Sequence, residues 1–163
     1  MAAEQDNNQV KAKNGELTRW VTFHLDKEVY GINVMQVQEV LRYSEIAPVP
    51  GSPDYVLGII NLRGNVVTVI DTRMRFGIEP MEVTDSSRIV IIEAGGQVVG
   101  ILVDSVAEVV DLSVDDIDPA PNIGTEESAQ FIKGVANLGQ ELLIIIDLNK
   151  LLTADEWDEI SRI

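Results

Sequence analysis

The sequence predicts a mainly β protein made of two small barrels that result from an internal duplication and pack around a shared core. Two repeated blocks and a series of short apolar segments punctuated by glycine predict it. Val29–Leu41 matches Val98–Val110, 69 positions later, at seven of thirteen positions. Gly58–Phe76 matches Gly134–Leu152 at an offset of 76, including an Asn-Leu pair and an Asp that closes the strand. Two blocks in the same order indicate two copies of one unit.

The repeat divides the chain into units of about 60 residues, and a core of that size is only marginally stable. We therefore expect the two units to pack on each other and fold together. The expected limits are a disordered polar tail over 1–16, one domain over 17–152 and a C-terminal helix over 153–163. Within the domain, the first barrel covers about 17–77 and the second about 87–152, with an exchange of strands between them left open.

The first unit begins with a predicted hairpin. Alternating apolar and polar residues indicate strands over Thr18–Leu25 and Glu28–Val34, separated by two turn residues. Apolar residues at helical spacing within Val34–Leu41 then predict a short helix or helical turn. A further strand is expected near Tyr43–Val49, and closely spaced prolines after it mark a loop.

A second hairpin is predicted between Val56–Asn61 and Asn65–Ile70, because Gly64 tolerates the left-handed conformation that a tight turn needs. The strands expected of the second unit are Arg88–Glu93, Gln97–Val103, Gly134–Leu138 and Glu141–Ile146. A capping box formed by Thr153 and Glu156 predicts the start of the C-terminal helix.

Composition excludes several classes of protein. Twelve Lys and Arg against 27 Asp and Glu give a net charge of −15, and no basic cluster compensates for it, so nucleic acid is not an expected partner. Without cysteine, and with His24 as the only histidine, a zinc site or a thiol nucleophile is not expected. The longest apolar run, Leu142–Ile146, is too short for a membrane helix, so we expect a cytoplasmic protein without membrane insertion.

Two aspartates, Asp71 and Asp147, occupy the same place in the repeat, after an apolar strand. Paired aspartates suggest acid–base or metal chemistry, but each is better explained as the N-cap of a following helical turn. The acidic segment Asp111–Asp118 lacks the spacing of a calcium-binding loop and reads as solvated. We therefore expect no catalytic residue, metal or cofactor. A small-molecule-binding barrel or a weak hydrolase that uses the aspartates is the alternative.

Residues present in only one copy of the repeat are free to serve function. Asn61 and Leu62 recur as Asn137 and Leu138, whereas Gly139 occupies the place of Arg63. Because the planar guanidinium group suits contacts with carboxylates and its stem packs on apolar surface, Arg63 is a candidate contact for a protein partner.

Four segments together carry a family resemblance. They are Glu28–Tyr43, Gly58–Gly77 with its N-L-R-G turn, Val98–Val110 and Phe131–Leu152. In these segments the chain closely resembles the CheW family of bacterial chemotaxis coupling proteins. The resemblance implies two SH3-like five-stranded barrels around a shared hydrophobic core, which agrees with the duplication.

The resemblance also implies a function and its residues. It implies a non-enzymatic adaptor that couples the cytoplasmic tips of chemoreceptors to the regulatory domain of the histidine kinase CheA, in signalling arrays at the membrane. The implied receptor contacts, in the groove between the barrels, are Val37, Glu39, Gly58, Arg63 and Val109. The implied kinase contacts are Ile46 and Leu57, although buried core positions would look the same. The alternative is a CheW-like paralogue that couples receptors to a kinase in another pathway, such as twitching motility.

Overall fold

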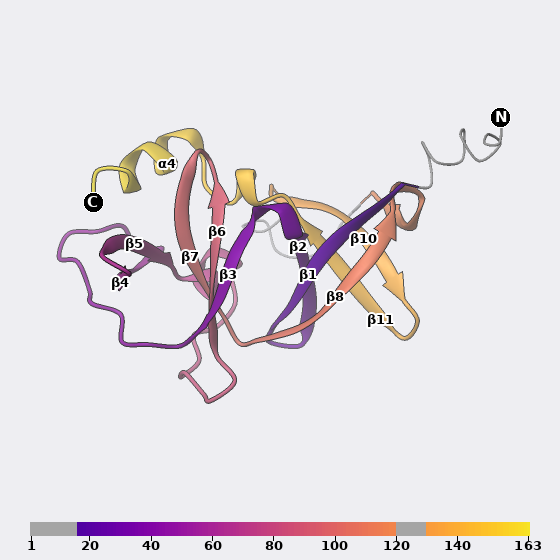
Figure 1. Cartoon of the computed structure of the whole chain (residues 1–163), viewed down its shortest axis with the longest axis horizontal. Coiled ribbons are helices and arrows are strands. Elements are labelled where there is room, and N and C mark those ends of the chain that lie inside the picture. Colours follow the sequence, from indigo (N-terminus) through magenta and orange to yellow (C-terminus); the bar gives the residue numbers. More distant parts are fainter. Residues whose placement is uncertain (1–15, 120–129) are drawn as a thin grey trace.

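Two β-sheets, seen in Figure 1, form the protein, and this confirms the mainly β prediction. The computed structural model describes residues 16–119 and 130–163, so nearly all of the predicted tail over 1–16 lies outside it. In spatial order, the first sheet consists of β8 (Ser105–Ser113), β1 (Leu17–Leu25), β2 (Glu28–Asn33), β11 (Glu141–Ile146), β10 (Ile132–Leu138) and the two-residue β9 (Ile117–Asp118). The second sheet consists of β3 (Val37–Arg42), β6 (Arg88–Ala94), β7 (Gln97–Val103), β5 (Asn65–Ile70) and β4 (Val56–Leu62).

The duplication extends to strand order and register. The two sheets have the same order of strands once each strand is exchanged for its repeat counterpart, and only β9 has no counterpart in the comparison. The counterparts of β1, β2, β3, β4 and β5 are β6, β7, β8, β10 and β11. The pair Val21↔Val109 corresponds to Val90↔Val40, at the offset of 69. Each sheet therefore takes strands from both sequence halves, so 17–77 and 87–152 delimit the repeat and not the sheets.

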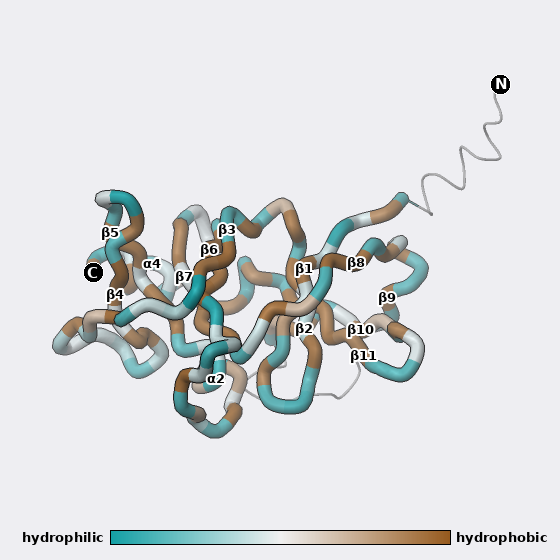
Figure 2. The backbone as a smooth tube through the Cα atoms, turned by 60° about the horizontal axis from the view of Figure 1, so that its bottom comes forward, coloured by the Kyte–Doolittle hydropathy of each residue, from teal (hydrophilic) through white to brown (hydrophobic). Residues whose placement is uncertain are grey.

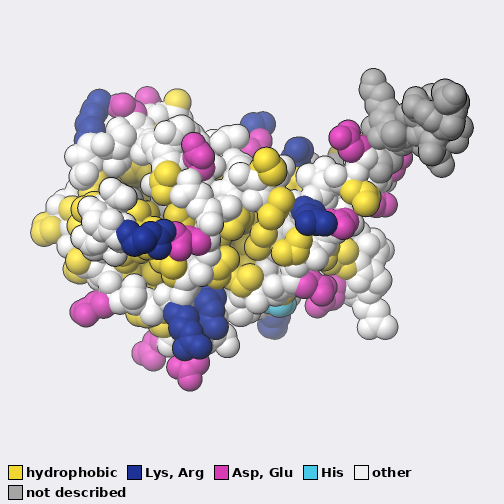
Figure 3. Space-filling view, viewed as in Figure 1, with side chains coloured by type: hydrophobic (Ala, Val, Ile, Leu, Met, Phe, Trp, Pro, Cys, Tyr) yellow, Lys and Arg dark blue, Asp and Glu magenta, His cyan; other side chains and the backbone are white. Residues whose placement is uncertain are grey.

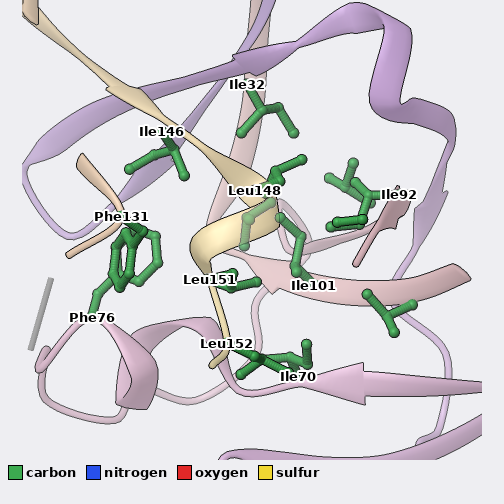
Figure 4. Packing of buried hydrophobic residues seen from close by; sticks show 14 of the residues in the cluster. Ile32, Ile70, Phe76, Ile92, Ile101, Phe131, Ile146, Leu148, Leu151 and Leu152 are labelled. Carbon is green, nitrogen blue, oxygen red and sulfur yellow. The ribbon is translucent and has the colours of Figure 1, made fainter. Parts of the chain in front are cut away.

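A shared hydrophobic core lies between the sheets. It contains residues of both sheets together with Leu148 and Leu151 from the short 3₁₀ turn η3 (Leu148–Lys150) and its C-cap. Figure 4 shows these two side chains among isoleucines from several strands. Each sheet also has a smaller cluster of its own. Figure 2 shows that hydrophobic segments follow the strands and that hydrophilic ones mark the turns between them.

The prediction of a short helix or helical turn after β2 is confirmed only as a single turn, which ends before the apolar spacing that suggested it does. Only a 3₁₀ turn, η1 (Val34–Gln36), follows β2, and the chain then continues as β3, paired with β6. A register shift between Val37 and Glu39 marks a β-bulge in this pair. Because a bulge moves following side chains to the other face, apolar residues three positions apart can share a face in a strand as well as in a helix. The bulge thus produced the spacing that suggested a helix.

The strand predicted over Tyr43–Val49 is also absent. A single β-bridge joins Ala47 to Ile59, with backbone hydrogen bonds of 2.9 Å in both directions. Pro48 and Pro50 flank the segment after the bridge, and proline has no N–H to donate to a ladder. The segment is therefore a loop held to β4 at one point.

The predicted turns and caps are confirmed. Two-residue turns join β1 to β2 and β6 to β7, with Asp26 in the left-handed region at φ 59°. Thr153 and Glu156 form the capping box of α4 (Ala154–Ile160). The α4 helix lies beside the β6–β7 hairpin in Figure 1, because buried Trp157 packs over Gly95.

Asp71 is the N-cap of the short helix α2 (Thr72–Arg75) and accepts a 3.1 Å hydrogen bond from the Met74 N–H. Asp147 caps η3 in the same way through the Asn149 N–H, at 3.1 Å. We expect Asp71→Ala to lower the free energy of unfolding by about 1 kcal/mol, because the cap is lost, and Asp71→Asn to change it little, because asparagine also caps. Urea denaturation of both variants measures this. Equal losses for Ala and Asn would contradict the capping role.

Candidate functional site

The edge strands β3 and β8 belong to different sheets and flank the middle of the molecule in Figure 1. Figure 3, in the same view, shows hydrophobic side chains gathered between them. We call this surface the apolar strip and define it as Met35, Val37, Val40, Val106 and Val109. Val40 and Val109 are 42% and 55% exposed, and Met35 is 86% exposed, whereas Val37 and Val106 are partly buried against the shared core. Exposed apolar side chains that gather on one surface are typical of a protein-binding site.

An ion pair involves Glu39, which stands between Val37 and Val40 on β3. Arg63 forms two hydrogen bonds with the carboxylate of Glu39, one of them of 3.4 Å between Nη1 and Oε1. The hydrogen bond raises the pKa of Arg63, so the guanidinium group stays charged. Because Glu39 belongs to β3 and Arg63 follows β4, the pair joins the two edges of the second sheet. The Arg63 side chain is 69% exposed, so the pair adds little stability and remains accessible to a partner.

The turn that carries Arg63 explains its position. Arg63 and Gly64 are the two residues between β4 and β5, at φ 52° and 89°. The Asn61 side chain accepts a 3.0 Å hydrogen bond from the Gly64 N–H and so stabilises the turn. A left-handed arginine in a two-residue turn projects from the hairpin end, which keeps its side chain out of the sheet.

Gly58 is buried and presents no side chain to a partner. Its φ is 152°, and a Cβ atom built on it would lie 2.2 Å from the Ala47 carbonyl oxygen. Gly134, its repeat counterpart, approaches the Asp118 carbonyl oxygen in the same way, at 2.6 Å. The glycine therefore allows the loop that contains Ala47 to form backbone hydrogen bonds with β4. Gly58 thus holds this loop in place from its buried position.

The predicted kinase contacts Ile46 and Leu57 lie together at the other end of β4. Both are partly buried against the interior cluster of the second sheet, and both line a cavity of about 320 Å³. Tyr43, Met81 and Val83 add exposed apolar surface to the same cavity. Leu57 and Arg63 are six residues apart on one strand and its turn, which separates the cavity from the ion pair by about 20 Å.

The sequence reasoning missed Arg73, whose side chain is only 10% exposed. Its Nε and Nη2 donate to the two carboxylate oxygens of Asp104 at 2.9 and 2.7 Å, and its Nη1 donates to the Glu79 carbonyl at 2.5 Å. Burial raises the pKa of Asp104, but hydrogen bonds from Arg73 and the Asp26 N–H outweigh it and lower the pKa. The segment between α2 and β6, which contains Glu79, is called the connector. Arg73 thus joins the connector to Asp104 in the β7–β8 link and to Asp26 in the β1–β2 turn.

Of the predicted receptor contacts, Glu39 and Arg63 are paired and Val37 and Val109 share the apolar strip, while Gly58 lies beneath the surface. In residues 16–119 and 130–163, His, Asp and Glu form no group of three that could hold a metal ion. No described helix is long and apolar enough to cross a bilayer. The two sheets exchange strands, the molecule has two separate apolar surfaces, and Asp71 and Asp147 act as caps. These features are typical of a binding scaffold.

Comparison with known proteins identifies the family. The CheW-like domain family matches residues 19–156. Chemotaxis protein CheW of Klebsiella aerogenes is 34% identical over 144 residues, covering 88% of this chain and 87% of that protein. CheW of Treponema pallidum is 31% identical over 156 residues, covering 93% and 92%. The crystal structure of the scaffolding protein TtCheW from Thermoanaerobacter tengcongensis has 37% identity and a TM-score of 0.78, covering 85% and 96%.

The chain belongs to the CheW-like family. The resemblance seen in its sequence is thereby confirmed, together with the fold of two β units and the function of a chemotaxis adaptor. The pathway outside chemotaxis is not favoured, because the relatives named above are chemotaxis or scaffolding proteins.

Proposed function

We propose that this adaptor couples the cytoplasmic tips of chemoreceptors to the regulatory domain of the histidine kinase CheA, in receptor arrays at the membrane. The observation that carries the proposal is the presence of two separate apolar surfaces, the apolar strip on β3 and β8 and the cavity beside the start of β4. An adaptor needs two such surfaces because it must hold both partners at once. Modest affinity at each suffices, since an array raises the effective concentration of every partner.

The receptor binds the apolar strip in this proposal. Val37 and Val109 supply apolar contact, and the Glu39–Arg63 pair lies beside it with exposed charge. Gly58 contributes through the loop that it supports. The regulatory domain of the kinase binds at the cavity that Ile46 and Leu57 line, where exposed Met81 and Val83 enlarge the apolar surface.

The adaptor carries out no reaction of its own in this proposal. Asp71 and Asp147, the residues that suggested a hydrolase, each accept a backbone hydrogen bond as helix caps. Signal passes by coupling: if contacts on one surface favour one arrangement of the adaptor, that preference changes the affinity of the other surface. Co-sedimentation of the chain with receptor tips and CheA tests the proposal, and no ternary complex at tens of micromolar would contradict it.

We expect Arg63→Asp to weaken binding of the receptor tip at least tenfold without unfolding the protein. The substitution replaces the Glu39–Arg63 ion pair with two neighbouring carboxylates. These repel each other and remove the positive charge that a partner meets at this turn. Titration of a receptor-tip fragment measures the binding, and circular dichroism checks the fold.

Arg162→Asp is the matched control, because Arg162 is 74% exposed, follows α4 and pairs with Asp158 of that helix at 2.6 Å. It makes the same change in net charge and should leave receptor affinity unaltered. A similar loss in both variants would mean that total charge, and not the Glu39–Arg63 pair, governs the interaction.

A further inference from the structure

The apolar strip has two walls that the repeat relates to each other. Val37 and Val40 of β3 correspond to Val106 and Val109 of β8, at the offset of 69. Their pairing is equivalent as well, since Val40 lies opposite Val90 and Val109 lies opposite the counterpart Val21. Both pairs of strands also contain a register shift at the corresponding place. In shape, the two walls therefore present nearly the same apolar surface.

The two walls differ in charge. Glu39 corresponds to Glu108, but only Glu39 has an arginine beside it, because Gly139 stands at the position of Arg63. Among the described residues, the Glu108 side chain forms no ion pair. Further along, Arg42 of β3 corresponds to Asp111 of β8, and Asp111 is paired with Arg19 of β1 at 3.1 Å, so the uncompensated carboxylate of this wall is Glu108. The β8 wall is therefore the more negative of two walls with similar shape.

A receptor helix that packs on symmetric walls can lie in either of two opposite directions with similar apolar contact. Charge then decides between the directions, because electrostatic complementarity sets register and orientation more than it sets affinity. A basic residue near one end of such a helix is attracted to Glu108, and Arg63 keeps it away from Glu39.

We propose that the Glu39–Arg63 pair sets the direction in which the receptor helix lies on the apolar strip, with the basic end of that helix at Glu108. This inference rests on the proposed function. The occupant it requires is an amphipathic helix with an apolar stripe and a Lys or Arg near one end. In this proposal Arg63 determines the direction of the receptor helix, and the valines of the apolar strip provide its apolar contact.

Directional cross-linking tests the proposal, and the absence of cysteine from the chain makes it practical. Single cysteines are placed at Gln38 and at its counterpart Ala107, both exposed, in separate full-length proteins. A receptor-tip fragment carries one cysteine next to its basic end. We expect its disulfide with the Ala107→Cys protein to exceed that with the Gln38→Cys protein by roughly two- to fivefold, as expected for one exposed charge pair.

Two further variants change only the charges. In Arg63→Ala, both glutamates are uncompensated, so the preference between the two cysteines should disappear. Adding Gly139→Arg and Gln140→Gly transplants the N-L-R-G turn to the second copy, and the preference should reverse. The transplant is sterically feasible, because a Cβ atom at Gly139 meets no atom within 4 Å in the described part of the chain and Arg63 itself has a positive φ.

An unchanged preference in both variants, with receptor binding retained, would overturn the inference and leave the proposed function standing. Failure of the unmodified protein to co-sediment with the fragment would instead overturn the proposed function, and this inference with it. Thermal unfolding of each variant shows whether a lost preference comes from a lost fold.

Discussion

Replacing Gly58 with alanine is expected to lower the free energy of unfolding by about 2 to 4 kcal/mol, as overpacking and backbone strain act together. The new Cβ atom would lie 2.2 Å from the Ala47 carbonyl oxygen and 2.9 Å from Ile46 Cγ2. The obstruction is backbone, which cannot rotate away as a side chain can. The chain must therefore break the Ala47–Ile59 bridge or bend β4. Urea denaturation measures the loss.

Gly64→Ala is the control for this prediction. Gly64 also has a positive φ, of 89°, but a Cβ atom there meets no atom of the described residues within 4 Å. We expect a loss of about 1 kcal/mol, from conformational strain alone. If both variants lose the same stability, close contact with Ala47 is not what requires glycine at position 58.

The same prediction separates two explanations of Gly58 as a site residue. If Gly58 acts through the loop, Gly58→Ala should weaken binding of the kinase at Ile46 and Leu57 at least as much as binding of the receptor. If it contacted the receptor directly, kinase binding would be unaffected. The buried position of Gly58 and its contact with Ile46 favour the first explanation.

Local features of the fold were predictable because they depend on short stretches of sequence. Asp71 and Asp147 follow apolar strands directly, and both proved to be caps. The turn at Gly64 followed from the backbone freedom of glycine. The β3 strand was not predictable in this way, because its bulge depends on pairing with β6, about 50 residues away in sequence.

The exchange of strands could not be predicted from the repeat. Two copies that close separately and two that exchange strands have the same internal contacts within each hairpin, so their local sequence patterns are identical. Arg73 illustrates a related limit within the site. It is absent from the second copy, where Asn149 stands, just as Arg63 is absent there. The repeat alone did not distinguish the buried structural arginine from the exposed one.

Arg73→Met is expected to lower the free energy of unfolding by about 2 to 4 kcal/mol at pH 7, because removal of one partner leaves a largely buried charge without compensation. Asp104 has a side chain that is 18% exposed, and among the described residues its carboxylate would retain only the hydrogen bond of 2.8 Å from the Asp26 N–H. The connector would also lose its attachment through the Glu79 carbonyl. Arg162→Met, on an exposed ion pair, should cause little change.

The dependence of this loss on pH identifies Asp104 as its cause. In the native protein the pKa of Asp104 lies below its usual value, so its contribution to stability is present above about pH 4, the unfolded pKa, and is lost as pH falls through the folded pKa. In Arg73→Met, burial without Arg73 raises the pKa of Asp104, so protonation relieves the destabilisation. The difference in stability between the two proteins should therefore narrow between pH 7 and pH 3.5, and a constant difference would contradict this account.

A double variant separates the charge of Asp104 from the loss of packing around Arg73. Asp104→Asn keeps the shape of the side chain but removes the charge, so Arg73→Met with Asp104→Asn should recover much of the stability at pH 7 and lose the pH dependence. The part that is not recovered measures the attachment of the connector at Glu79. Since that connector supplies Met81 and Val83 to the cavity, the unrecovered part should be accompanied by weaker kinase binding, whereas the charge effect should not.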